Sequence, residues 1–283
     1  NYVFDRDKDA IYAAIDAAMG RIAPDVDMVL VEGTGHAGVG SVIDASNADV
    51  AAHLNAKAII IAGGGIGSSI DEICLNKALF ELAGVEVIGA IINKVRPDKY
   101  EKVSVAVRQG LANKGIRCLG LVPFEAGLTY PTVRQLSEEL SFECVAGHSY
   151  LDARVTSTIV AAMSPQNTAR YLKRDTFVIV PGDRVDNILV SIATQLVGKL
   201  SDERRVAGIL LTGGMVPDEM IRDLMRESHV PVLLTTDDTF RAAARVERLT
   251  VKIGPADKDK VQTACEMIQT YVDIDAIRAA IGL

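Results

Sequence analysis

Glycine-rich segments and single polar residues follow several β-branched runs of this sequence, at positions where α/β proteins bind ligands. The run that begins at Met28 ends in Glu32 and continues as Gly33-Thr34-Gly35-His36-Ala37-Gly38, which fits the pattern G-x-G-x-x-G. A carboxylate at a strand end suits Mg²⁺ or a metal-bound phosphate, so we interpret Glu32 as a metal-site residue and Gly33 and Gly35 as cofactor-binding residues. The alternative is an acid that caps a turn. A nicotinamide site is disfavoured because the next run ends in glycine rather than in an acidic residue.

The next two runs end in residues that could contact the same ligand. The loop Ala62–Ser69, with Gly64 and Gly65 at its centre, lies between an expected strand and an expected helix, whose N-terminal amides can approach a phosphate or carboxylate. Asn93, followed by Lys94, lies at the end of the third run, which begins at Val87. Its side-chain amide has a donor and an acceptor that could read a nucleobase. The structural alternative for the glycine loop is a flexible turn with Ser69 as the helix N-cap. For Asn93 it is a side chain bonded to its own loop, and both alternatives stay open.

The second half of the chain has two comparable loops. Asp183-Arg184 follows the run that begins at Thr176, and Thr212-Gly213-Gly214 follows the run that begins at Val206. If these two strands are adjacent and parallel, the glycine amides and the guanidinium form a small concavity that binds an anion. The structural alternatives are a helix-capping acid beside a surface cation, and a tight turn.

The elements that position these residues are predicted from hydrophobic runs. Eight runs are continuous rather than alternating, which is typical of parallel strands covered on both faces; they begin near Met28, Ala58, Val87, Arg117, Thr176, Val206, Pro231 and Thr250. Helical patterns lie between them, so the fold class is α/β. The spacing breaks between the fourth and fifth runs, and we predict a boundary near Gly147, with domains 1–147 and 148–283.

Composition limits the functional classes. The 283 residues are 49% hydrophobic and 24% charged, which is typical of a soluble globular protein with two domains. The net charge of -7, without a basic block, excludes nucleic acid as a partner. No apolar run approaches the ~20 residues of a membrane helix, and the four cysteines form no C-x-x-C pair, so we expect no membrane partner, buried thiols and a cytoplasmic location.

The first half resembles a known family. E-G-T-G, A-G-G-G-I-G, I-I-N-K-V and G-L-V-P, at the ends of successive expected strands, resemble the dethiobiotin synthetase-like branch of P-loop proteins, which includes the cobyrinic acid a,c-diamide synthases. Over about residues 9–145 the similarity is closer to the N-terminal region of bacterial phosphotransacetylases and their stand-alone relatives, through VEGTGHAGVGSVIDASNADVAAHLNAKAIIIAGGG. This resemblance implies a parallel-sheet, P-loop NTPase-type domain. In it, Glu32 serves Mg²⁺ through the nucleotide, Asn93 contacts the adenine, and Pro123 lies at the same cofactor edge.

The second half is similar to the DRTGG domain, a smaller α/β module. The similarity rests on Pro181-Gly182-Asp183-Arg184, on Leu211-Thr212-Gly213-Gly214 and on the segment PVLLTTDDTFRAAARV. Val185 stands where the family pattern has threonine, so this chain lacks that hydroxyl.

No segment fits G-x-x-x-x-G-K-[ST]. We therefore expect ATP and Mg²⁺ to bind only if a phosphate loop lies upstream of Asn1, and we expect that residues precede Asn1. The predicted function is a regulatory protein that senses a nucleotide or small anion, forms a homo-oligomer and controls acetyl-phosphate or acetyl-CoA metabolism. The alternatives are an ATP-dependent ligase that activates a carboxylate, and an oligomer scaffold with a vestigial site. No complete catalytic constellation occurs in the sequence, so enzymatic activity is left open.

Overall fold

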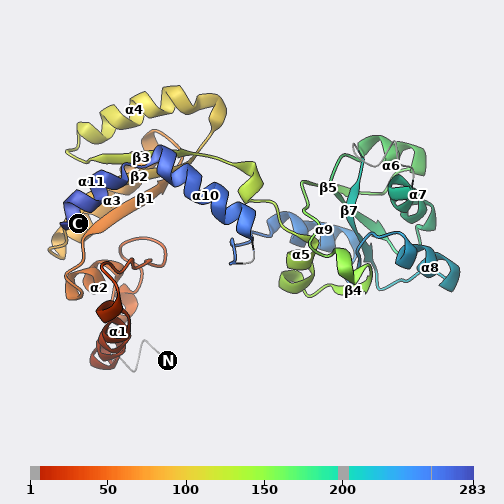
Figure 1. The fold of residues 1–283 in the computed structure, drawn as a ribbon, viewed down its shortest axis with the longest axis horizontal. Coiled ribbons are helices and arrows are strands. Elements are labelled where there is room, and N and C mark those ends of the chain that lie inside the picture. The colour runs from red at the N-terminus through yellow and green to blue at the C-terminus, as the bar shows by residue number, and fades with distance from the viewer. Residues whose placement is uncertain (1–6, 197–203, 256) are drawn as a thin grey trace. The chain divides into compact units, whose positions relative to one another are not determined.

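The computed structural model describes residues 7–196, 204–255 and 257–283, and the contacts divide the chain into two compact units (Figure 1). Unit 1 comprises the chain up to Glu125 together with Lys258–Leu283, and unit 2 comprises Ala126–Asp257. None of the helices in the described ranges is long and apolar enough to cross a membrane.

Unit 1 is built on three parallel strands in the order β1-β2-β3, with helices on both faces. The strands are β1 (Ala58–Gly63), β2 (Val87–Val95) and β3 (Cys118–Pro123). Helices α3 (Gly67–Leu82) and α4 (Tyr100–Ala112) cover one face, where Ile73 and Val107 pack in one core cluster with Ile92. Helices α10 (Lys258–Tyr271) and α11 (Ile274–Ile281) lie on the other face, where Leu119 and Ala276 share a cluster. Helices α1 (Lys8–Ile22) and α2 (Asn47–His53) precede the sheet.

Unit 2 has a five-stranded sheet in the order β4-β8-β7-β6-β5. Strands β5 (Ser157–Val160), β6 (Thr176–Pro181), β7 (Val206–Thr212) and β8 (Val232–Leu234) are parallel, and β4 (Glu143–Ala146) pairs antiparallel with β8. One face packs against α7 (Val185–Leu196) and α8 (Glu219–Glu227), with α6 (Pro165–Tyr171) beside α7. The other face packs against α5 (Val133–Leu140) and α9 (Thr239–Arg248). Short 3-10 turns in the chain occupy Ala23–Asp25, Ser41–Ile43, Pro97–Lys99, Ala126–Leu128 and His148–Tyr150.

The division by contacts differs from the expected ranges 1–147 and 148–283. Helix α5 begins with a capping box between Thr132 and Gln135 and buries Val133 and Leu136 in a core of unit 2. The C-terminal helices contact β3 and so belong to unit 1. A single cut in the sequence cannot represent a chain that returns to its first unit after completing the second.

Six of the eight runs predicted as strands form strands, but the runs at Met28 and Thr250 do not. In the first, Met28, Leu30 and Val31 are 51%, 85% and 53% exposed. A strand needs a hydrogen-bonded neighbour, and no strand of the described chain pairs with this segment. The run at Thr250 is short and stops at Gly254-Pro255, where proline has no amide to donate to a neighbouring strand. The sequence reasoning did not predict the short strands β4 and β5, which are four residues long each.

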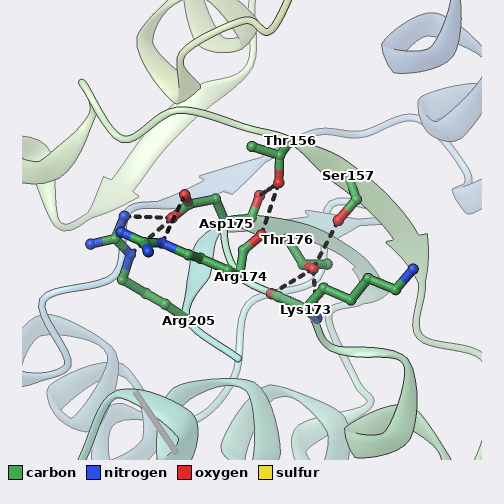
Figure 2. Close-up of polar contacts among 7 residues, drawn as sticks. All are labelled: Thr156, Ser157, Lys173, Arg174, Asp175, Thr176 and Arg205. Carbon is green, nitrogen blue, oxygen red and sulfur yellow. Dashed lines mark hydrogen bonds and ion pairs between the residues drawn. The ribbon is translucent and has the colours of Figure 1, made fainter. Parts of the chain in front are cut away.

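Hydrogen bonds and ion pairs connect residues at the N-terminal ends of β5, β6 and β7 (Figure 2). Asp175 has a left-handed backbone, with φ 60°, and its carboxylate accepts hydrogen bonds from Arg205 at 2.9 and 2.5 Å. The Thr156 hydroxyl donates to the carbonyl oxygen of Arg174 at 2.8 Å, and the Thr176 hydroxyl donates to that of Lys173 at 2.8 Å. These bonds lie at the amino ends of the strands, so the opposite edge is left to the candidate ligand loops.

Candidate functional site

The carboxyl ends of β1, β2 and β3 bring the predicted loops of unit 1 to one edge of the sheet. In the parallel register, Gly63 pairs with Asn93, and Val95 pairs with Pro123. The loops that follow the three strands therefore leave the sheet side by side. This is the edge at which open α/β sheets bind ligands.

The glycine loop after β1 passes close to the loop after β2. A Cβ atom on Gly64 would lie 2.5 Å from the carbonyl oxygen of Lys94, so this position needs glycine. A Cβ atom on Gly65 would lie 2.9 Å from Oγ of Ser69. Ser69 does not cap α3; its hydroxyl donates to the Gly63 carbonyl oxygen at 2.6 Å, and the helix begins without a side-chain cap. The first-turn amides of α3 thus have no capping side chain, and the positive end of the helix dipole there suits a phosphate.

One of the two polar atoms of the Asn93 side chain is hydrogen-bonded within its own loop. Its Oδ1 atom accepts a hydrogen bond from the Lys94 amide at 2.8 Å, and Lys94 has φ 60°. Within the described chain, Nδ2 of Asn93 makes no hydrogen bond. The structural alternative therefore accounts for one end of the amide, and the other end is available to a ligand.

The loop after Glu32 is held by two asparagine side chains. The segment that precedes this loop is not a strand. Asn47 donates hydrogen bonds to two carbonyl oxygens of this loop, at 3.1 and 2.9 Å. The buried Asn76, on α3, accepts one from a loop amide at 2.7 Å. Gly35 has φ 74°, and a Cβ atom on Gly33 would lie 3.1 Å from the Asn47 side chain. These glycines let the loop pack against α2 and α3, while Glu32 is exposed on an irregular segment.

Metal binding has little support from the side chains alone. The ranges that the structure describes contain no group of three or more His, Cys, Asp or Glu that could hold a metal ion. Glu32 would therefore need phosphate oxygens to complete a Mg²⁺ site. A hollow of about 420 Å³, lined by Lys8, Tyr12 and His53 among others, lies near Ala83, where α3 ends, away from the glycine loop at its start.

In unit 2, β6 and β7 are adjacent and parallel, as the predicted concavity requires. Pro181 pairs with Thr212, and the Gly182 amide donates to the Thr212 carbonyl oxygen at 3.2 Å. A Cβ atom on Gly182 would lie only 1.9 Å from the carbonyl oxygen of Met215. The two loops therefore touch at the carboxyl edge of the sheet.

The glycine amides, however, are not free to hold an anion. The Gly213 amide donates to the carbonyl oxygen of Asp237 at 2.8 Å, and the Gly214 amide donates to that of Thr235 at 2.9 Å. The buried Thr212 hydroxyl shares a hydrogen bond of 2.7 Å with Thr239. The prediction that these amides form the concavity is wrong in this respect, because the loop after β8 already occupies them.

Arg184 is also engaged within the protein. Its Nε and Nη2 atoms donate to the two carboxylate oxygens of Asp186, both at 3.0 Å, and Nη2 donates to the Met163 carbonyl oxygen at 2.9 Å. The side-chain hydrogen bond lowers the pKa of Asp186 and raises the pKa of Arg184. The arginine side chain is still 34% exposed, and Asp183 is exposed beside it, so this pair can meet a ligand.

Three asparagines that the sequence reasoning missed hold these loops. Asn187, on α7, is fully buried and donates to the carbonyl oxygens of Ala161 and Met163, at 3.0 and 2.8 Å. Asn47 and Asn76 play the corresponding part for the loop after Glu32. For Asn76, the available signal was an asparagine in the middle of a helical pattern, where this residue is unfavourable unless its side chain has a partner elsewhere.

Two domain-family models match this chain. Residues 4–132 match the model of an AAA domain, and residues 135–249 match the model of the DRTGG domain. The chain therefore carries a dethiobiotin synthetase-like AAA domain followed by a DRTGG domain. The first match holds although no G-x-x-x-x-G-K-[ST] segment occurs in the sequence.

Bacterial phosphate acetyltransferases are similar to the chain over most of its length. The identity is 28% over 263 residues with the enzyme of Nitratidesulfovibrio vulgaris, covering 87% of this chain and 36% of the relative. It is 27% over 274 residues with that of Synechocystis sp., covering 92% and 39%. It is 26% over 294 residues with that of Pseudomonas aeruginosa, covering 97% and 41%. The chain thus spans less than half the length of these relatives, and its domains are consistent with the N-terminal region of phosphotransacetylases.

A solved structure overlaps loosely with this chain. The crystal structure of the CBS and DRTGG domains of the regulatory region of Clostridium perfringens pyrophosphatase, complexed with its activator diadenosine tetraphosphate, aligns with 60% of this chain and 85% of that chain. The sequence identity is 13% and the TM-score is 0.33, which is a loose overlap.

Proposed function

We propose that this chain is a nucleotide-sensing regulatory region that controls acetyl-phosphate or acetyl-CoA metabolism, through a fused catalytic domain or a separate partner. The observation that carries the proposal is the register that places the glycine loop, Asn93 and Pro123 side by side at one edge of unit 1. The similarity to phosphate acetyltransferases over most of the chain supports the choice of metabolism. ATP with Mg²⁺ is the proposed ligand, since the AAA domain match is compatible with both.

Each of these residues would contact a different part of the nucleotide. The uncapped first turn of α3 would face phosphate oxygens, because Gly64 and Gly65 allow the backbone to approach closely. Nδ2 of Asn93 would donate to the adenine edge. Glu32 would act on Mg²⁺ only through the bound nucleotide.

Titration calorimetry with ATP and with GTP, each with Mg²⁺, tests this proposal. Asn93→Ala should weaken ATP binding by roughly 1–3 kcal/mol, the cost of leaving a buried polar group unpaired, and should reduce the preference for adenine over guanine. Gly64→Ala should weaken both nucleotides, because its Cβ atom meets the Lys94 carbonyl oxygen. Gly63→Ala is the matched control, since nothing lies within 4 Å of a Cβ atom there. An unchanged adenine preference in Asn93→Ala would assign that side chain to its own loop.

The phosphate loop and the metal have separate tests. If a G-x-x-x-x-G-K-[ST] loop is encoded ahead of Asn1, the longer chain should bind ATP with Mg²⁺ more tightly than the 283-residue chain. Glu32→Gln should then reduce the dependence of binding on Mg²⁺. If the two chains bound ATP with equal affinity and without dependence on Mg²⁺, the proposal that this edge of unit 1 binds ATP with Mg²⁺ would be wrong.

For unit 2, the proposed ligand is a phosphate-bearing or carboxylate metabolite held by Asp183 and Arg184. Thr212, Gly213 and Gly214 would then support the site rather than touch the ligand, because their polar groups are bonded within the protein. A thermal-shift screen of nucleotides and organic anions should find compounds that stabilise the wild type and not Arg184→Ala. Equal stabilisation of both proteins would place the ligand elsewhere.

A further inference from the structure

Two arginines of unit 2 share one carboxylate at the amino end of the sheet. Arg205 donates hydrogen bonds from Nε and Nη2 to Oδ1 of Asp175, at 2.9 and 2.5 Å, and Nε of Arg174 lies 3.7 Å from Oδ2 of the same residue. Figure 2 shows both guanidinium groups directed at this carboxylate. We call Arg174, Asp175 and Arg205 the amino-edge cluster. With two cations and one carboxylate, the cluster has an excess of positive charge.

The arginines elsewhere in unit 2 show the contrast. On α8, Arg222 and Arg226 contact two acids, Glu219 and Asp223, so the charges there balance. Arg245 pairs with a carboxylate of its own. Two guanidinium groups that share a single carboxylate repel each other, and an anion that joins them removes this repulsion. The imbalance therefore points to a ligand rather than to a contact that only stabilises the fold.

The backbone holds the two arginines in place. The Asp175 amide donates to the Arg205 carbonyl oxygen at 2.6 Å, which joins the loop before β6 to the residue before β7. The Thr156 hydroxyl donates to the Arg174 carbonyl oxygen at 2.8 Å. Asp175 has φ 60°, a left-handed conformation that few residues other than glycine, asparagine and aspartate adopt. The backbone of the cluster is thus fixed before a ligand arrives, which lowers the entropic cost of binding.

The two guanidinium groups keep donors for a ligand. The side chains of Arg174 and Arg205 are 66% and 48% exposed, whereas that of Asp175 is 14% exposed. Within the described ranges, Nη1 of Arg205 makes no hydrogen bond. The contact of Arg174 with Asp175, at 3.7 Å, is too long for a hydrogen bond. An incoming anion therefore meets the arginines before it meets the acid.

Further positive charge lies close to the cluster. Nη1 of Arg204 donates to the Ala169 carbonyl oxygen at 3.4 Å, so Arg204 lies against the end of α6 that carries Arg170. The sequence segments 170–175 and 202–205 contain five Lys and Arg residues and three Asp and Glu residues. The whole chain has a net charge of -7. This edge is therefore a local positive region on an acidic protein, and such a region attracts anions.

We propose that the amino-edge cluster binds the phosphate chain of an oligophosphate, either inorganic or part of a nucleotide. A guanidinium group can donate two parallel hydrogen bonds to one phosphate group, so a chain of phosphates can engage Arg174 and Arg205 together. Its several negative charges also offset the positive charge of this edge more fully than a single carboxylate does. The site is separate from the sites proposed at the carboxyl edges of the two sheets, and the inference does not rest on them.

Titration calorimetry of the full 283-residue chain with tripolyphosphate at low ionic strength tests this site. Arg174→Gln should weaken binding by roughly tenfold or more, because it removes charge-assisted hydrogen bonds to the ligand and leaves those between Arg205 and Asp175 in place. Arg226→Gln is the matched control, since Arg226 is 50% exposed but lies on α8 among balanced charges, and it should bind like the wild type. In thermal unfolding, Arg174→Gln should be at least as stable as the wild type, because it relieves the repulsion.

Further comparisons separate this site from the others and identify what it contacts. Gly64→Ala and Arg184→Ala, which alter the two carboxyl-edge sites, should retain the binding event that Arg174→Gln weakens. ATP should bind the cluster about as tightly as tripolyphosphate, and adenosine should not bind it, because the arginines contact only the phosphate chain.

Four results would overturn the proposal. The first is a wild type that does not bind tripolyphosphate, and the second is equal binding by the wild type and Arg174→Gln. The third is an equal loss in Arg226→Gln, which would assign binding to the general charge of the surface. The fourth is an Arg174→Gln chain that is clearly less stable than the wild type, which would assign this arginine to the structure.

Discussion

Replacing Asn187 by alanine tests how the Asp183-Arg184 loop is supported. Alanine leaves the Ala161 carbonyl oxygen without its side-chain donor, and a buried unpaired group costs about 1–3 kcal/mol. The Met163 carbonyl oxygen keeps its bond from Arg184 at 2.9 Å, so the loss there is smaller. Removal of Oδ1 of Asn187, which has no hydrogen-bond partner among the residues that the structure describes, offsets part of this cost. We expect unit 2 to lose about 2 kcal/mol in its free energy of unfolding.

Differential scanning calorimetry measures this loss with an internal reference. Two compact units allow two transitions, and a loss of this size should lower the melting temperature of unit 2 by roughly 6–12 °C while leaving that of unit 1 unchanged. Arg184→Ala should have a smaller effect than Asn187→Ala, because its ion pair with Asp186 is partly exposed and screened. If Arg184→Ala were more destabilising than Asn187→Ala, the arginine rather than the asparagine would hold the loop, and the reasoning would be refuted.

Three further outcomes are expected. Gly182→Ala should destabilise unit 2 by ~1–3 kcal/mol in urea unfolding, because its Cβ atom would lie 1.9 Å from the Met215 carbonyl oxygen; an unchanged midpoint would contradict the contact. Arg184→Ala should raise the pKa of Asp186 in an NMR titration, since the hydrogen bond lowers it, and the small stability this pair contributes should be lost as pH falls through the folded pKa. Burial raises the pKa of the Cys118 thiol, so at pH ~8 it should react with iodoacetamide more slowly than free cysteine; an equal rate would show that it is not buried.

The sequence anticipated the central strands and the loops that follow them. Strands β2 and β6 are continuous β-branched runs, and both are buried as such runs require. The pairing of Gly63 with Asn93 follows from parallel neighbours, which the regular spacing of the first runs indicated. The same pattern failed for the run at Met28, because a strand also needs a neighbour to pair with.

The candidate sites were less predictable than the strands. The glycines at 64 and 182 are required by close contacts with Lys94 and Met215, which lie far along the chain and could not be inferred from turn chemistry. The carbonyl oxygens that Asn47 and Asn187 bind also lie far along the chain, so their roles could not be inferred from local patterns.

Local patterns determined which segments form helices and strands and which loops contain glycine, because those properties depend on neighbours along the chain. They did not determine which polar groups stay free. The Gly213 and Gly214 amides are occupied by carbonyl oxygens of Asp237 and Thr235, and these arrive only when β8 pairs with β7. A donor satisfied by a distant segment looks the same in the sequence as a donor waiting for a ligand, so tertiary pairing decides which of the two it is.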